Sequence, residues 1–208
     1  GDRGETTVGT GIEAGAAGRK IRIDGTDAAA EELLSVLRVL WLTPAMDGLF
    51  TGPEGDRRRF LDRLTMALSP AHGRHATAYE KAMRQRNRLL EEVRPDPAWL
   101  EAAEAELARH GAALAAARRD MLEALSARLS AEDDGPGDFP RGALALAGDM
   151  ETRAAEEAAD DPAALEALLR RTWREGRRRD QAAGRTLVGP HRTQLAVTHV
   201  DKAMPAHK

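Results

Sequence analysis

A seven-residue repeat of apolar residues is the feature that most limits how this chain can fold. Between Ala98 and Ser130 the recurring residues are Leu100, Leu107, Leu114 and Met121. A repeat of this period describes the seam of a coiled-coil-like helix, and a helix of this length extends roughly 50 Å. One such helix cannot bury its seam alone. We therefore expect a long helical arm that packs against a neighbouring helix.

The neighbouring helix is predicted directly before the long one, from an apolar stripe at helical spacing. Its members are Tyr79, Met83, Leu90 and Val93. Only four residues, 94–97, join the two helices, and two of them are prolines. Because a connection this short permits only a sharp reversal, the two helices should pack antiparallel.

Arg86 and Asn87 interrupt this apolar stripe. An arginine or an amide on a buried face needs partners, because burying an unpaired polar group is expensive. The nearest plausible carboxylate is Asp62, on the preceding helix. We therefore expect Asp62 to anchor Arg86, and Asn87 to bond a main-chain group at the base of the arm.

That preceding helix is predicted to begin at Pro53, because proline suits a first helical turn whose N–H groups lack partners. Apolar residues recur at helical spacing from Phe60 to Leu68, and Ser69-Pro70 should end the helix.

Four arginines on this helix, Arg57, Arg58, Arg59 and Arg63, form a basic cluster. They could grip nucleic-acid phosphates. Equally, Arg58 could pair with Asp62 four residues further on, and Arg57 or Arg59 could tether the helix to a β domain. The sequence leaves both interpretations open.

The region before the helices is predicted to hold strands and one short helix. Residues 6–12 and 20–23 alternate in hydropathy, and the turn Asp24-Gly25 follows them. Asp27 can cap a helix that runs through Leu37. Residues 39–42 are apolar throughout, which predicts a short buried strand before Thr43-Pro44.

After the long helix, the acidic, Gly/Pro-rich residues 132–140 predict a linker, and residues 144–146 predict a strand. A final helix should begin at Asp161-Pro162 and end at Gly184. Its inward residues should be Leu165, Leu168, Leu169 and Trp173.

A rigid turn, Gly189-Pro190-His191-Arg192, should then lie between two strands at 186–188 and 195–198. It presents an imidazole and a guanidinium. His191 and Arg192 could contact a nucleotide phosphate or a domain interface, or the turn could be a buried structural one.

The order of strands, helices and strands predicts an α+β fold, predominantly α, in which a helical module is inserted into a β-containing domain. The expected divisions are 1–52 for a first β region, 53–180 for the helical arm domain, and 181–208 for the return strands.

Composition excludes several classes of site. The net charge of −3 gives no global attraction to nucleic acid, so a DNA-binding surface must be a local patch of arginines. The absence of cysteine excludes disulfides and Cys-ligated metals. His72 and His75 lie three residues apart, but no carboxylate or third histidine is close in sequence, so we assign no metal site.

Motifs for catalysis and targeting are also missing. The sequence contains no phosphate-binding Gly-rich loop followed by Lys-Ser/Thr, no H-E-x-x-H and no nucleophile elbow. No signal peptide is visible, and the longest apolar run is too short to span a bilayer. These observations assign no catalytic residue and lead us to expect a cytoplasmic protein that does not contact membranes.

Several motifs, taken in this order, resemble those of the RecF family, bacterial DNA replication and repair proteins of the SMC-like ABC ATPase group. The matching segments are Lys20-Ile21-Arg22-Ile23-Asp24-Gly25-Thr26, Thr43-Pro44, Arg57-Arg58-x-Phe60-Leu61-Asp62, Tyr79, Arg84-Gln85-Arg86-Asn87 and Gly189-Pro190-His191-Arg192. The resemblance runs along most of the chain and is weakest over residues 95–180.

The resemblance implies an ABC-type ATPase head with an inserted coiled-coil-like arm. For a full-length protein it implies ATP and Mg²⁺ as cofactors, an ATP-dependent homodimer, and binding of single-stranded DNA and of junctions between single and double strands. It also implies work with RecO and RecR, and indirectly with RecA, in DNA repair, recombination, replication restart and the SOS response.

The sequence departs from the family pattern in two ways. The family's Walker A loop lies before residue 1, and its signature and Walker B motifs lie after residue 208, so we expect an internal piece that alone neither holds a cofactor nor hydrolyses ATP. Thr193-Gln194 follow Arg192, where the family usually has acidic residues. The rival interpretation is a structural or protein-interaction helical module without nucleic-acid contact.

Overall fold

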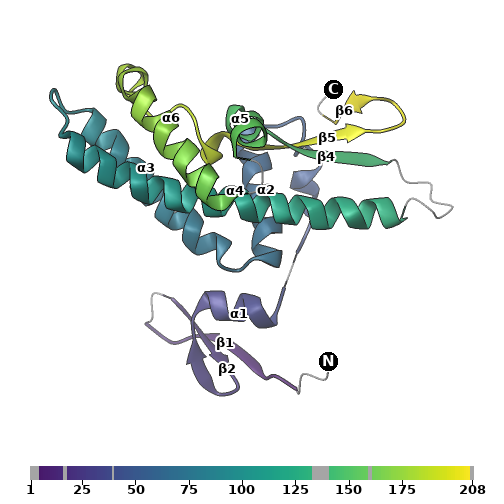
Figure 1. Ribbon diagram of the computed structural model, residues 1–208. Coiled ribbons are helices and arrows are strands. Elements are labelled where there is room, and N and C mark those ends of the chain that lie inside the picture. The colour runs from purple at the N-terminus through teal and green to yellow at the C-terminus, as the bar shows by residue number, and fades with distance from the viewer. Residues whose placement is uncertain (1–4, 16–17, 39, 133–140, 159–160, 207–208) are drawn as a thin grey trace.

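The structure, a computed structural model, describes residues 5–15, 18–38, 40–132, 141–158 and 161–206. Three long helices lie against one another: α3 (His72–Leu90), α4 (Pro97–Glu132) and α6 (Pro162–Ala183) (Figure 1). One small sheet lies beside α4, and a second, formed by the first strands of the chain, lies apart from these three long helices. The predicted α+β class with helix predominating is confirmed.

α3 and α4 form the expected antiparallel pair. His75 of α3 meets His110 of α4, whereas Arg86, further along α3, meets Glu104, earlier in α4. The seven-residue repeat of α4 is buried throughout, as predicted: Leu100, Leu107, Leu114 and Met121 are each no more than 3% exposed. The long helix therefore buries its seam and is not a free rod.

α6 completes the burial of that seam, which the sequence alone did not indicate. Its predicted inward residues Leu165, Leu168, Leu169 and Trp173 are all buried, and Leu107 and Leu114 belong to the same core. Both predicted ends are confirmed. The Asp161 carboxylate accepts the Ala163 N–H at 2.9 Å, and Gly184 ends the helix in the left-handed conformation (φ +64°) that glycine adopts easily.

The sheet beside α4 is built from β4 (Gly142–Ala147), β5 (Gln194–His199) and β6 (Met204–Pro205), all antiparallel. α2 (Glu54–Leu68) begins after Pro53, as predicted, and contacts β5 and α4. Leu61, Met121 and Leu195 form a second core between these elements. α5 (Asp149–Glu157), which the sequence did not predict, follows β4 and contacts α6.

β4 lies inside the range 53–180 expected for the helical arm domain, yet it is paired with β5, which comes from the expected return strands. The range expected for the arm thus contributes a strand to the same sheet as residues 194–199. The division of the chain at 52 and 180 stays a prediction.

The first strands and their turn form as predicted. β1 (Val8–Ile12), β2 (Arg19–Ile23) and β3 (Thr26–Ala28) pair antiparallel, with Asp24 and Gly25 at positive φ in the hairpin turn. α1 (Ala30–Val36) packs on β2. Figure 1 shows this unit joined to the helices by an extended segment.

Two expectations about that segment are wrong. Asp27 does not cap α1, because it lies in β3, where its carboxylate accepts from Arg22 Nε at 2.8 Å, and Ala29 is the N-cap. Residues 40–42 are not a buried strand, and Leu42 is 79% exposed. Neither of the two described sheets pairs with them. A short 3-10 turn, η1 (Pro44–Met46), follows.

Two further expectations fail near the ends of helices. Val93 is 96% exposed, because α3 ends at Leu90. Residues 186–188 are not a strand, because the Thr186 N–H bonds to Asn87 and the Leu187 N–H to Asp180.

Most of the predicted linker at 132–140 lies outside the described residues. Within the described residues, no helix is both long and apolar enough to cross a membrane.

The buried seam gives a direct prediction about stability. Leu107→Asp and Leu114→Asp should each lower the free energy of unfolding by about 3 kcal/mol or more, because each removes apolar packing and places a carboxylate in the core. Leu129→Asp, on the exposed end of the same helix, is the matched control and should change it by less than about 1 kcal/mol. Thermal and urea unfolding measure the effect. Equal losses in all three variants would mean that α4 does not pack along this seam.

Candidate functional site

Arg86 lies at the centre of a buried polar network that joins the three long helices. Its side chain is 0% exposed. Nε donates to Glu104 Oε1 of α4 at 3.1 Å, Nη1 to Asp180 Oδ2 of α6 at 2.8 Å, and Nη2 to the Trp173 carbonyl at 2.9 Å. The prediction that Arg86 points inward and is paired is confirmed. Its predicted partner Asp62 is wrong.

The network continues beyond Arg86 in two directions. Glu104 also accepts from Arg177 Nη2 at 2.7 Å, so two guanidiniums and two carboxylates balance one another in this buried space. Asn87 Oδ1 accepts from the Thr186 N–H at 2.9 Å and from the Thr186 hydroxyl at 2.7 Å. The predicted main-chain bond of Asn87 is therefore confirmed, and it fixes the segment that leads into the turn at 189–192.

Asp62 belongs to a second network. Its Oδ1 accepts from Arg118 Nε at 2.9 Å and Nη2 at 2.8 Å, and lies 2.7 Å from His72 Nε2. Burial alone would raise the pKa of Asp62, but the hydrogen bond from His72 and the charge of Arg118 outweigh burial and lower it. Arg118 Nη1 donates to the Pro190 carbonyl at 2.6 Å. This network therefore ties α2 and α4 to the turn.

The turn itself, η2 (Pro190–Arg192), holds His191 inward. His191 Nε2 lies 3.1 Å from the Thr186 carbonyl, and Nδ1 lies 2.8 Å from the Tyr79 hydroxyl. Since a carbonyl only accepts, Nε2 carries the proton and Nδ1 accepts from Tyr79. Burial lowers the pKa of His191 to about 4. The imidazole is thus a neutral structural clamp.

Gly189 and Arg192 are the first and last residues of the turn that contains His191. Gly189 has φ +144°, and an added Cβ would lie 2.7 Å from the Tyr79 hydroxyl oxygen, so no other residue fits there. The Arg192 side chain is exposed and has no hydrogen-bonded or ion-pair partner in the part of the chain that the structure describes. Of the two predicted site residues in the turn, only Arg192 faces solvent.

The four arginines of α2 have different surroundings. Arg57 Nη1 donates to the carbonyls of Phe50 and Gly52, at 3.1 and 2.9 Å, and Nη2 donates to Gln194 Oε1 at 3.0 Å. Arg57 therefore tethers α2 to the preceding loop and to β5, which is the structural alternative considered from the sequence. These bonds occupy the guanidinium that a phosphate would need.

The other three arginines are less constrained. Arg58 lies 3.9 Å from Glu54 and not against Asp62, which is already held by Arg118. Arg59 is the most exposed at 75% and pairs only with Asp56 among the described residues. Arg63 lies over the Trp41 ring, 5.2 Å from its centroid. Contact of these side chains with DNA stays a prediction.

Sequence reasoning missed the partners Glu104, Arg118 and Asp180, although a signal was present. Glu104 and Arg118 each follow a seam leucine of α4 by four residues, so both lie beside the buried stripe. Asp180 follows Trp173 by seven residues on the inward face of α6. Each of the three is a charged residue on or beside the apolar face of its helix, as Arg86 is. A search of every helix for charged residues at such positions would have found them.

The structure adds no evidence for a metal bound by three or more side chains at the two histidines singled out from the sequence, within the residues it describes. The described part of the chain contains no group of three or more His, Asp or Glu side chains placed to hold a metal ion. His72 and His75, three residues apart, point to different partners, Asp62 and His110.

Comparison with known proteins gives a consistent result. No protein-family model matches the chain. It is 50% identical over 209 residues to the DNA replication and repair protein RecF of Mesorhizobium japonicum, covering 99% of this chain and 54% of the relative. It is 51% identical over 207 residues to RecF of Brucella suis, covering 98% of this chain and 52% of the relative. The chain thus spans about half the length of the curated relatives it matches.

Two solved structures of RecF proteins share the fold of this chain at lower identity. A structure of the recombination mediator protein RecF-ATPrS in the RecFOR pathway superposes with a TM-score of 0.76 at 18% identity, covering 92% of this chain and 51% of that one. A RecF-ATP structure superposes with a TM-score of 0.74 at 17% identity, covering 97% and 53%. At such identity the likeness shows a shared fold.

The two networks predict a specific pattern of energetic coupling. In double-mutant cycles, Arg86→Met should couple with Asp180→Asn by about 0.5–3 kcal/mol, because the side chains are in direct contact. Arg86→Met combined with Asp62→Asn should instead be additive within about 0.5 kcal/mol. Urea unfolding of the single and double variants measures both. Stronger coupling of Arg86 with Asp62 than with Asp180 would overturn this assignment.

The buried, neutral His191 predicts that the free energy of unfolding depends on pH. An unfolded histidine has a pKa of about 6.5, whereas that of folded His191 is about 4. Below pH 6.5 the unfolded chain therefore takes up a proton that the folded chain does not, so stability present above pH 6.5 is lost as the pH falls toward 4.

His191→Asn removes the titrating group, so the stability advantage of the wild type over this variant should shrink between pH 7.5 and pH 4.5. His199→Asn, on the central strand β5 of the sheet beside α4, is the control. Urea unfolding at several pH values measures the difference. An advantage that stays constant over this range contradicts the burial of a neutral His191.

Proposed function

The chain belongs to the RecF family, and we propose that it forms the helical arm and part of the ATPase head of a RecF-like protein of DNA replication and repair. Identity of about 50% along the chain supports this assignment, as does the fold shared with RecF. The residues that carry the family motifs also lie together, because Arg86, Asn87, Tyr79 and the turn at 189–192 form one connected network.

Within that protein we assign to this chain the task of holding the arm at a fixed angle to the head. The supporting observation is the Arg86 network, in which one buried side chain bonds to α4, α6 and Thr186 together. Arg118 of α4 adds a bond to the Pro190 carbonyl. Because α4 runs past both networks, a change in its direction would break charged hydrogen bonds at two points.

In this proposal, ATP binding and hydrolysis are activities of the full-length protein. The full-length protein would bind and hydrolyse ATP with Mg²⁺ and dimerise in its presence. RecO and RecR would be its partners, and RecA loading at gapped DNA its outcome. This chain alone would not hydrolyse ATP, because its sequence lacks the phosphate-binding loop.

DNA contact is assigned to the outward face of α2. Arg59 and Arg63 supply positive charge there, and half-buried Arg58 lies on the same helix. A net charge of −3 requires such a contact to be local. The alternative is a structural or protein-interaction module, which would bind no DNA.

The salt dependence of DNA binding separates these two functions. The chain should bind single-stranded and gapped DNA in fluorescence anisotropy, with an affinity that falls as salt rises, because phosphate contacts release counterions. Arg59→Ala should weaken binding and reduce the slope of log K against log salt by about 1.

Arg84→Ala is the matched control, since Arg84 is similarly exposed and also pairs with a carboxylate within its own helix. It should bind DNA as the wild type does. Absence of salt-dependent binding by the wild type, with the fold intact by circular dichroism, would favour the structural module.

A further inference from the structure

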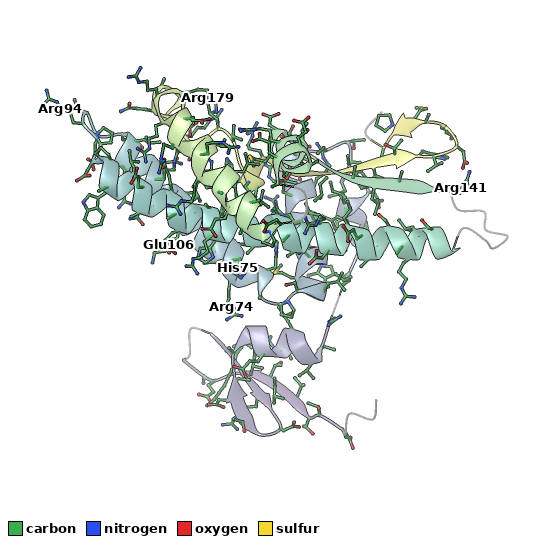
Figure 2. The ribbon with its side chains drawn as sticks, in the orientation of Figure 1. Arg74, His75, Arg94, Glu106, Arg141 and Arg179 are labelled. Carbon is green, nitrogen blue, oxygen red and sulfur yellow. The ribbon has the colours of Figure 1, made fainter. Side chains whose placement is uncertain are left out.

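His75 of α3 and His110 of α4 face each other across the helix pair, outside the networks described above. Their Nδ1 atoms lie 3.0 Å apart, and the rings are tilted by 55°. Both side chains are half-buried and reach the surface, where Arg74, His75 and Glu106 project along one edge of the helices (Figure 2). No pattern in the sequence connects His75 with His110, which are 35 residues apart.

We propose that His75 and His110 form a two-histidine binding site for a divalent transition metal ion, which would cross-link α3 to α4. Imidazole nitrogens lie about 2.0–2.1 Å from such an ion. Two nitrogens at that distance and 3.0 Å from each other subtend about 90° at the ion. That angle suits adjacent positions of a tetragonal site, which Cu²⁺ and Ni²⁺ prefer, better than the wider angle of tetrahedral Zn²⁺.

The two helices hold this spacing rigidly. One turn beyond His75, Tyr79 packs against Gly111, where an added Cβ would lie 3.1 Å from the tyrosine ring. Leu107, one turn before Gly111, is completely buried in the same core. The ligand nitrogens are therefore held in position before an ion arrives, which lowers the entropic cost of binding.

A histidine that binds a metal through one ring nitrogen usually donates a hydrogen bond from the other, and the surroundings of His110 bear on that second nitrogen. Without metal, His110 Nε2 lies 3.2 Å from Arg109 Nη2, and since a guanidinium only donates, the proton of His110 is on Nδ1 and is shared with His75. Metal binding moves that proton to Nε2. Glu106 Oε2 lies 3.7 Å from Nε2 and accepts from Arg109 Nη2 at 2.6 Å, so a small shift of the Glu106 side chain would bring it within hydrogen-bond range of that proton. Metal-bound histidines usually donate to such a carboxylate.

The charged side chains near the two histidines have opposite effects on cation binding. Arg74 and Arg109 place positive charge next to the pair, which weakens cation binding, whereas Glu106 favours it. Arg109 also competes for His110 Nε2. Removing Arg109 should therefore strengthen binding, and removing the Glu106 carboxylate should weaken it.

The test is thermal unfolding of the untagged chain with NiCl₂ and CuCl₂. Either salt should raise the melting temperature by about 5 °C at saturation, since a ligand of the folded state alone stabilises it, and EDTA should reverse the rise. His75→Gln and His110→Gln should each abolish it. His199→Gln, a half-buried histidine of β5 with no histidine partner among the described residues, should retain it.

Two further measurements make the assignment specific. Electron paramagnetic resonance of Cu²⁺ bound to the chain should show coupling to two nitrogens in the wild type and loss of that pattern in His75→Gln. Arg109→Gln should bind Ni²⁺ more tightly than the wild type, and Glu106→Gln about 10–100-fold more weakly. No rise in melting temperature with either ion, or a rise that survives in His75→Gln, would overturn the proposal.

Discussion

The buried guanidinium of Arg86 is the interaction on which the rest of this structure depends. Removing a charge from water costs several kcal/mol unless its hydrogen bonds are replaced. Here the replacements come from α4, α6 and Thr186, so no pair of elements can satisfy Arg86 alone. Arg86 is therefore fully paired only when the three helices are packed together and Thr186, in the segment before the turn at 189–192, is also in place.

The long helix α4 carries one member of each polar network. Glu104 bonds to Arg86, and Arg118 bonds to Asp62 and to the Pro190 carbonyl, fourteen residues or roughly 20 Å further along the helix. An apolar seam alone would tolerate a shift of α4 by one seven-residue repeat, or two turns. Two charged contacts at separate points do not, and so they fix the register as well as the direction of the arm.

The sequence predicted most of the elements because their signals are local. The seven-residue repeat, Pro53, Asp161 and Gly184 each act within a turn or two of the chain, and all were placed correctly. It also predicted that Arg86 must be paired, since burial of a charge forces that conclusion. The choice of Asp62 as partner failed because proximity in sequence carries no information about which helix lies on the far side. Asp180, 94 residues away, becomes a neighbour only after α6 has folded back onto α3 and α4. The apolar residues 40–42 misled for a related reason, since a strand needs a partner as well as an apolar sequence.

The central claim is that Arg86 couples the three helices and the turn into one cooperative unit. Native-state hydrogen exchange of Arg86→Met, compared with the wild type and with an exposed control, Arg84→Ala, tests this most directly. The account predicts that amide protection falls together in α3, the second half of α6 and residues 186–192, although only part of this region contacts Arg86. A loss of protection confined to the turn of α3 around residue 86, with the turn at 189–192 unchanged, would contradict it.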